Sequence, residues 1–92
     1  MTIEDQLRER LRKVEALFLG AAKRADLKRV PALLPRLAPA GALWVVFPKG
    51  RTEVTERDVL GAGREAGLKD IKVVRFSETH TALKFVRPKD QR

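Results

Sequence analysis

One stretch decides the fold: Gly41-Ala-Leu-Trp-Val-Val-Phe47, seven residues without a charge. An apolar run of this length is typical of a buried central strand that helices cover on both faces. A helical pattern follows over residues 56–66, and two more apolar segments, Ile71–Phe76 and Thr81–Val86, come after it. Residues 77–80 are polar and suit the turn of a hairpin. The sequence therefore predicts a strand, a helix and two strands joined as a hairpin.

The predicted helix is the best-specified element of the chain. Thr55 can cap it, Asp58 stands at the third helical position, and Val54 can pack onto Val59. Gly67 can end it in the left-handed conformation that glycine allows. Small residues along one face permit close approach to a sheet: Val59, Ala62, Gly63 and Ala66.

The first 40 residues are harder to assign. Thr2 can cap a first amphipathic helix, and residues 14–19 fit either a continued helix or a strand, of which we predict the strand. A second helix is expected from Asp26 to Leu37. Prolines at positions 31 and 35 disturb it, so one straight helix and two helical turns that meet near Pro31 are equally compatible with the sequence. Residues 38–41 are expected to turn the chain into the central strand.

These elements predict a single α/β domain over residues 1–92. Strands separated by helices form parallel pairs with right-handed connections, and the hairpin adds one antiparallel strand. The expected strand order is first, second, fourth, third. With about three helices on both faces, the fold class is a truncated, doubly wound three-layer sandwich.

Several segments resemble a bacterial family known as domain of unknown function 3052. They are Leu37–Lys49, with its Leu-Trp-Val core, Thr55–Val59, Gly67–Val73 and Thr79–Phe85. The family is similar to the carboxyl-terminal half of a class I methyltransferase fold, and it implies no particular activity. The resemblance also implies that the half with the glycine-rich cofactor loop is missing, because Gly61-Ala-Gly63 lies inside a helix. We therefore expect no cofactor, no S-adenosylmethionine binding and no enzymatic reaction by this chain alone.

Composition excludes several kinds of site. The 92 residues include no cysteine, one histidine and one serine, so thiolate metal sites and disulfides cannot form. Ser77 and His80 lie in the same predicted hairpin, where His80 is expected to form hydrogen bonds rather than act as a base. No run is long enough to span a membrane, and a cytoplasmic protein is expected. The abundance of charge and the scarcity of thermolabile residues suit a thermophile.

The net charge of +8 is spread along the chain and suggests an acidic partner or nucleic acid, unless it only solvates the surface. In the predicted sheet, the loops after the first two strands emerge at one edge, where ligands of open α/β sheets bind. These loops carry the residues of a hypothetical anion or phosphate site: Lys23, Arg24, Lys49, Gly50, Arg51 and Thr52. Trp44 is assigned to the core, so no aromatic and basic stacking surface is expected.

The first strand suggests a second hypothesis. In a complete fold this strand would be paired on both sides, whereas here its outer edge lacks a partner. The residues of this dimer edge are Ala16, Leu17, Phe18 and Leu19, which either pair with a second copy or are covered by the first helix. The sequence thus leaves two functions open. One is a non-catalytic interaction or scaffold domain that forms a homodimer, and the other is a nucleic-acid or anionic-ligand binding protein.

Overall fold

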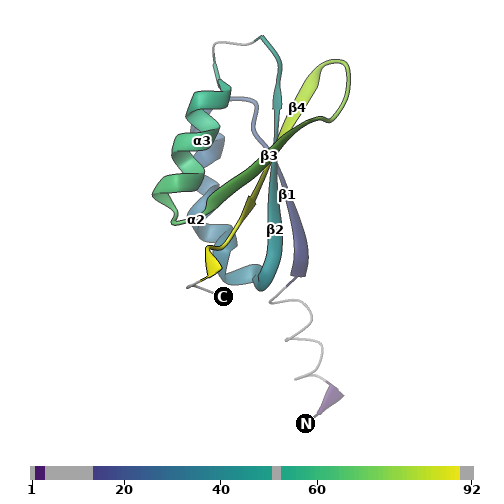
Figure 1. Ribbon diagram of the computed structural model, residues 1–92, viewed down its shortest axis with the longest axis vertical. Helices are drawn as coiled ribbons and strands as arrows, with labels where there is room; N and C mark the ends of the chain where they lie inside the picture. Colours follow the sequence, from purple (N-terminus) through teal and green to yellow (C-terminus); the bar gives the residue numbers. More distant parts are fainter. Residues whose placement is uncertain (1, 4–13, 51–52, 90–92) are drawn as a thin grey trace.

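The computed structural model describes residues 2–3, 14–50 and 53–89. Within them the chain forms an open sheet with helices packed beside it (Figure 1). Most of the predicted first helix lies outside the described residues. The elements, in chain order, are β1 (Val14–Gly20), η1 (Arg24–Arg29), α2 (Val30–Leu33), η2 (Leu34–Arg36), β2 (Leu37–Pro48), α3 (Glu56–Glu65), β3 (Lys69–Arg75) and β4 (His80–Val86).

The four strands form one mixed sheet in the order β1-β2-β4-β3, which confirms the predicted topology. β1 is parallel to β2, and β4 is antiparallel to both β2 and β3. Residues 14–19 are a strand, as predicted. The fold is a Rossmann-like α/β fold, in which the ends of β1, β2 and β3 meet at one edge, at the top of Figure 1.

The helices lie on one face of the sheet, so the described residues form two layers rather than the predicted three (Figure 1). The reason is the direction in which the chain winds. The connections from β1 to β2 and from β2 to β3 both move the same way across the sheet. Right-handed connections that move in the same direction place their helices on the same face.

The core fills the space between this face and the helices. Its strand residues alternate along the chain, and its helical residues include Leu27, Val30 and Val59. Gly63 of α3 lies directly against the ring of Phe85, where any Cβ atom would overlap three ring carbons. The small-residue face predicted for this helix is therefore its contact with the sheet. The strand residues of this core cluster are Leu19, Leu37, Leu43, Val45, Phe47, Leu83 and Phe85.

Of the two segments that meet at Leu37, one agrees with the prediction and the other does not. The second helix is broken into η1, α2 and η2, which agrees with the disturbance expected from its prolines. Residues 38–41 do not form a turn, because β2 already begins at Leu37. Pro39 disfavours the helical conformation at the residue before it, and the guanidinium of Arg87 donates hydrogen bonds to the carbonyls of Leu34 and Leu37. Both effects hold this segment extended.

The ends of α3 match the prediction closely. The Thr55 hydroxyl accepts a hydrogen bond from the Asp58 amide at 3.2 Å, and the Asp58 carboxylate accepts one from the Thr55 amide at 3.0 Å. Gly67 has a φ angle of 83°, in the left-handed region that favours glycine. None of the helices among the described residues is long and apolar enough to cross a membrane.

Candidate nucleic-acid interface

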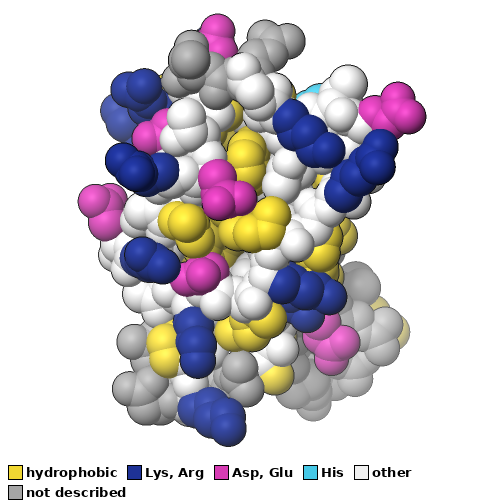
Figure 2. Space-filling model, turned by 45° about the horizontal axis from the view of Figure 1, so that its top comes forward, with side chains coloured by type: hydrophobic (Ala, Val, Ile, Leu, Met, Phe, Trp, Pro, Cys, Tyr) yellow, Lys and Arg dark blue, Asp and Glu magenta, His cyan; other side chains and the backbone are white. Residues whose placement is uncertain are grey.

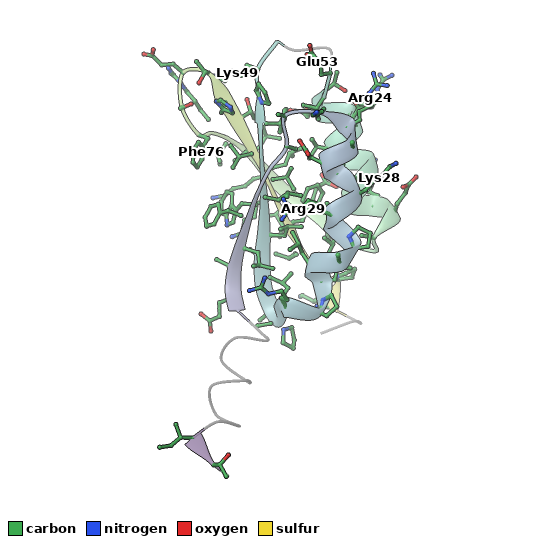
Figure 3. All side chains as sticks on the ribbon, turned by 180° about the vertical axis from the view of Figure 1, so that it is seen from behind. Arg24, Lys28, Arg29, Lys49, Glu53 and Phe76 are labelled. Carbon is green, nitrogen blue, oxygen red and sulfur yellow. The ribbon has the colours of Figure 1, made fainter. Side chains whose placement is uncertain are left out.

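The predicted anion site lies at the edge where β1 and β2 end. The structure joins its two loops, since the Arg24 amide donates to the Glu53 carbonyl at 3.1 Å. Lys49 and Gly50 follow β2, and the Lys49 amide donates to the Thr79 carbonyl of the hairpin at 2.9 Å. Figure 3 shows Arg24 and Lys49 in this upper region of the molecule. Arg51 and Thr52, the other two predicted residues, lie outside the described residues.

Acidic side chains already occupy much of this edge. Asp26 accepts hydrogen bonds from the amides of Ala22 and Lys23, and these bonds lower the pKa of its carboxyl group. The hydrogen bond from the Thr55 amide likewise lowers the pKa of Asp58, whose carboxylate is also 3.3 Å from the Arg24 guanidinium. Figure 2 shows basic and acidic side chains interspersed where this edge is tilted forward. The edge is therefore of mixed charge, which weakens its case as an anion site.

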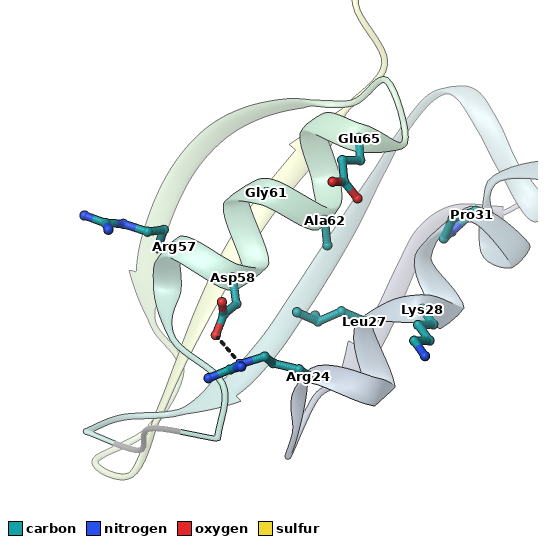
Figure 4. A pocket seen from close by; sticks show the side chains of 9 residues that line it. All are labelled: Arg24, Leu27, Lys28, Pro31, Arg57, Asp58, Gly61, Ala62 and Glu65. Carbon is teal, nitrogen blue, oxygen red and sulfur yellow. Dashed lines mark ion pairs between the residues drawn. The ribbon is translucent and has the colours of Figure 1, made fainter.

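A groove of about 640 Å³ runs between η1 and α3 (Figure 4). It combines basic and acidic groups over a floor of small and apolar residues, and the ion pair of Arg24 with Asp58 crosses one end. Such a lining favours neither an anionic nor a cationic ligand. The lining residues are Arg24, Leu27, Lys28, Pro31, Arg57, Asp58, Gly61, Ala62 and Glu65.

Three polar residues of the hairpin, Ser77, Thr79 and His80, form hydrogen bonds with one another. The Ser77 hydroxyl accepts hydrogen bonds from the amides of Thr79 and His80, at 3.3 and 3.1 Å. The Thr79 hydroxyl is 2.8 Å from Nδ1 of His80. These bonds give Ser77 and His80 a role in the turn. The part of the chain that the structure describes contains no group of three metal-ligating side chains.

The other face of the sheet carries the feature that sequence reasoning missed. We define the open face as the face that η1, α2 and α3 do not cover. One row of side chains crosses it from edge to edge: Phe18 of β1 is paired with Trp44 of β2, Trp44 with Lys84 of β4, and Lys84 with Lys72 of β3. We call this set the aromatic–lysine row. A register shift between Asp70 and Lys72 places Lys72, rather than Ile71, opposite Lys84.

Trp44 interacts with the other three side chains of this row. The rings of Phe18 and Trp44 are stacked, with centroids 6.2 Å apart and planes 11° from parallel. The Nζ atoms of Lys84 and Lys72 lie 5.4 and 6.0 Å from the centroid of the Trp44 ring, within cation–π range. Phe18 remains 63% exposed and Lys72 is exposed, whereas Trp44 and Lys84 are half-buried. The row thus presents an aromatic surface with two ammonium groups beside it.

The surroundings of the row are apolar or basic. The paired positions above and below it on the open face include no acidic residue among those described. Figure 3 shows Phe76, which is 57% exposed, on the side of the sheet away from the helices. The neighbouring positions are Ala16, Ala42, Val86 and Lys69 on one side of the row, and Gly20, Val46, Ala82 and Val74 on the other.

The predicted dimer edge lies beside this row. β1 is at the edge of the described sheet and pairs with β2 on its inner side. Ala16 and Phe18 belong to the open face, while Leu17 and Leu19 point toward the helices and contact the core.

No family model matches the sequence, and no curated protein matches it either. Solved structures do resemble its fold. The Methanococcus jannaschii fibrillarin pre-rRNA processing protein is 14% identical with a TM-score of 0.65, over 91% of this chain and 41% of that one. M1.HpyAVI is 18% identical with a TM-score of 0.61, over 95% of this chain and 50% of that one.

Both neighbours have methyltransferase-like, Rossmann-type folds, which supports the methyltransferase-like resemblance inferred from the sequence. This chain spans half or less of their length. At such low identity the likeness concerns the fold alone.

Proposed function

We propose that this protein binds single-stranded nucleic acid on its open face. The observation that carries the proposal is the aromatic–lysine row, in which Phe18 and Trp44 stack beside two lysine side chains. We further propose that the chain is a non-catalytic member of the domain of unknown function 3052 family. Binding then occurs without a reaction and without a cofactor.

The chemistry of the row fits both parts of a nucleotide. An unpaired base can stack on the exposed ring of Phe18, and stacking on an aromatic side chain contributes about 1–3 kcal/mol per base. The ammonium groups of Lys72 and Lys84 can contact the phosphates on either side. The net charge of +8 adds long-range attraction to a polyanion, and the absence of acids from the described rows of the open face removes local repulsion.

The shape of the site favours single strands over duplexes. The open face is a sheet surface whose rings lie beside one another, so a base must leave its own stack to reach them. Bases in a duplex are stacked inside the helix, whereas those of a single strand can be splayed onto a protein surface. A sheet with exposed aromatic side chains is one of the surfaces that single-stranded RNA uses.

The test uses the only tryptophan in the chain, Trp44, as the probe. Titration with oligo(U), oligo(dT) and a matched duplex should quench its fluorescence with the single strands and leave it nearly unchanged with the duplex. Comparison of oligo(U) with oligo(dT) then separates RNA from DNA. Affinity should fall as salt rises, since each phosphate contact contributes about 0.7 to the logarithmic salt slope for single strands. A fluorescence signal that no single strand alters would disprove the proposal.

Two double variants with the same change in charge locate the site. Lys72→Gln/Lys84→Gln removes the cations of the row, and Lys23→Gln/Lys49→Gln removes those of the predicted loop site. The first should reduce the salt slope by about 1.4, for two phosphate contacts, and weaken binding roughly tenfold at low salt. The second should weaken it about threefold or less. The reverse ranking would move the site to the loops and overturn the assignment to the open face.

A further inference from the structure

The two edges of the sheet are built differently. β3 carries four charged residues in seven, and its ladder is interrupted by the register shift between Asp70 and Lys72. Charges and bulges of this kind keep an edge strand from pairing with another chain. β1, with the sequence Val-Glu-Ala-Leu-Phe-Leu-Gly, has neither lysine nor proline, and Glu15 is its one charge. Among the described residues, β1 is therefore the edge without such protection against pairing.

We propose that β1 pairs antiparallel with β1 of a second copy of this chain, joining two four-stranded sheets into one. An antiparallel pair of identical strands is related to itself by a two-fold axis, so a single strand supplies both sides of the interface. Backbone amides and carbonyls at the outer edge of β1 would find partners in this way. The functional part of the inference rests on the function proposed above, because it concerns the same open face.

Charge makes β1 the edge at which two copies approach most easily. A net charge of +8 per chain opposes association. The described residues of β1 contribute no positive charge, whereas β3 brings Lys69, Lys72 and Arg75 to the opposite edge. Contact through β1 therefore holds the lysines of the two copies as far apart as the sheet allows.

The pairing would make one nucleic-acid site from two. A two-fold axis perpendicular to the sheet leaves both open faces on the same side. If the pairing is centred on Leu17 or Phe18, the two Phe18 rings share this face as opposite or diagonal neighbours. The two aromatic–lysine rows then join, with four aromatic rings in the middle and a pair of lysines at each end. Each copy contributes half of this joined binding surface.

The first experiment measures the assembly without nucleic acid. Sedimentation should give the mass of two chains, each of 10.4 kDa. Because the chain has no cysteine, Val73→Cys places a single spin label on β3. In the joined sheet the two β3 strands are seven strand spacings apart, so pulsed electron resonance should show roughly 34 Å between labels. A mass of one chain, or labels only a strand spacing apart, would overturn the proposal.

The second experiment uses a matched pair of edge variants. Ala16 and Val73 are both exposed, so Ala16→Lys and Val73→Lys add the same charge to opposite edges. Ala16→Lys should give the mass of one chain, because a lysine protects an edge strand. Val73→Lys should remain at two. Two results together would contradict pairing through β1. Ala16→Lys would have the mass of two chains, and the double variant Ala16→Lys/Val73→Cys would show the same distance between labels as Val73→Cys.

The composite site is tested with oligonucleotides of about five and about twelve nucleotides, within the span typical of small single-strand binders. The wild type should bind the longer one at least tenfold more tightly than the shorter one. Ala16→Lys adds a charge that acts on both oligonucleotides, so the ratio of the two affinities is compared, and it should fall to threefold or less. A two-chain assembly without the length gain would overturn the composite site. Failure of both oligonucleotides to bind would disprove the proposed function instead, and the mass and label distance would still decide the pairing.

Discussion

The two faces of the sheet have different surroundings, although the same strands form both. One face packs against the helices, and the helices do not cover the other (Figure 1). In β2, Leu43, Val45 and Phe47 are buried against the helices, while Trp44 and Val46 alternate with them and face the other way. The covered face holds the core together. The open face places rings and ammonium groups at the surface. With the proposed function, stability and binding depend on opposite sides of the same strands, so substitutions on the two faces should affect them separately.

The largest expected effect comes from breaking the covered face. Leu43 is fully buried, so Leu43→Ala should lower the free energy of unfolding by about 2–5 kcal/mol. Phe18→Ala removes a larger side chain from the open face, yet it should cost less than about 1 kcal/mol because most of that side chain is exposed. Urea denaturation of both variants checks this. Equal losses would mean that something covers the open face.

A second pair sharpens the comparison within α3. Gly63→Ala forces a methyl group into the ring of Phe85, and overpacking of this kind costs about 1–3 kcal/mol. Gly61→Ala meets no atom within 4 Å and should raise the free energy of unfolding by about 0.5–1 kcal/mol through helix propensity. Thermal denaturation should therefore move in opposite directions for the two variants. A stabilised Gly63→Ala variant would contradict the close contact with the sheet.

The smallest effect concerns pH at the ends of the helices. Hydrogen bonds lower the pKa values of Asp26 and Asp58 below the ordinary 3.8. Their stabilising contribution is then present above that value and is lost as the pH falls through the lowered pKa values. The melting temperature should therefore decline as the pH falls below about 4, and Asp26→Asn/Asp58→Asn should flatten that decline. An identical pH profile in the double variant would exclude these caps as its cause.

The sequence predicted what local patterns control. The cap at Thr55 and the left-handed Gly67 each depend on residues that are close together in the chain. The strand order follows from the handedness of the connections and from the short hairpin between β3 and β4. The single-sided packing could also have been derived, because the predicted strand order already implies connections that run the same way. Local pattern misled us at residues 38–41, where a proline suggested a turn and the structure has a strand.

The aromatic–lysine row could not be found in the same way. Its four residues come from four strands, and they align only through the register of three strand pairs. One shift of register in β3 decides whether a lysine or an isoleucine stands at its end. The sequence did contain one signal, the alternation that puts Trp44 opposite in phase to Leu43 and Val45. An apolar run without charges hid this alternation, so Trp44 was assigned to the core.

The shared direction of the two connections has a consequence for how such a domain can grow. A strand and helix added in the same direction would widen the existing helical layer and leave the open face uncovered. A connection that ran in the opposite direction across the sheet would place its helix on the open face and bury Phe18 and Trp44. A domain that grew by reversing the direction of its connections would therefore lose its open face and gain a second hydrophobic core.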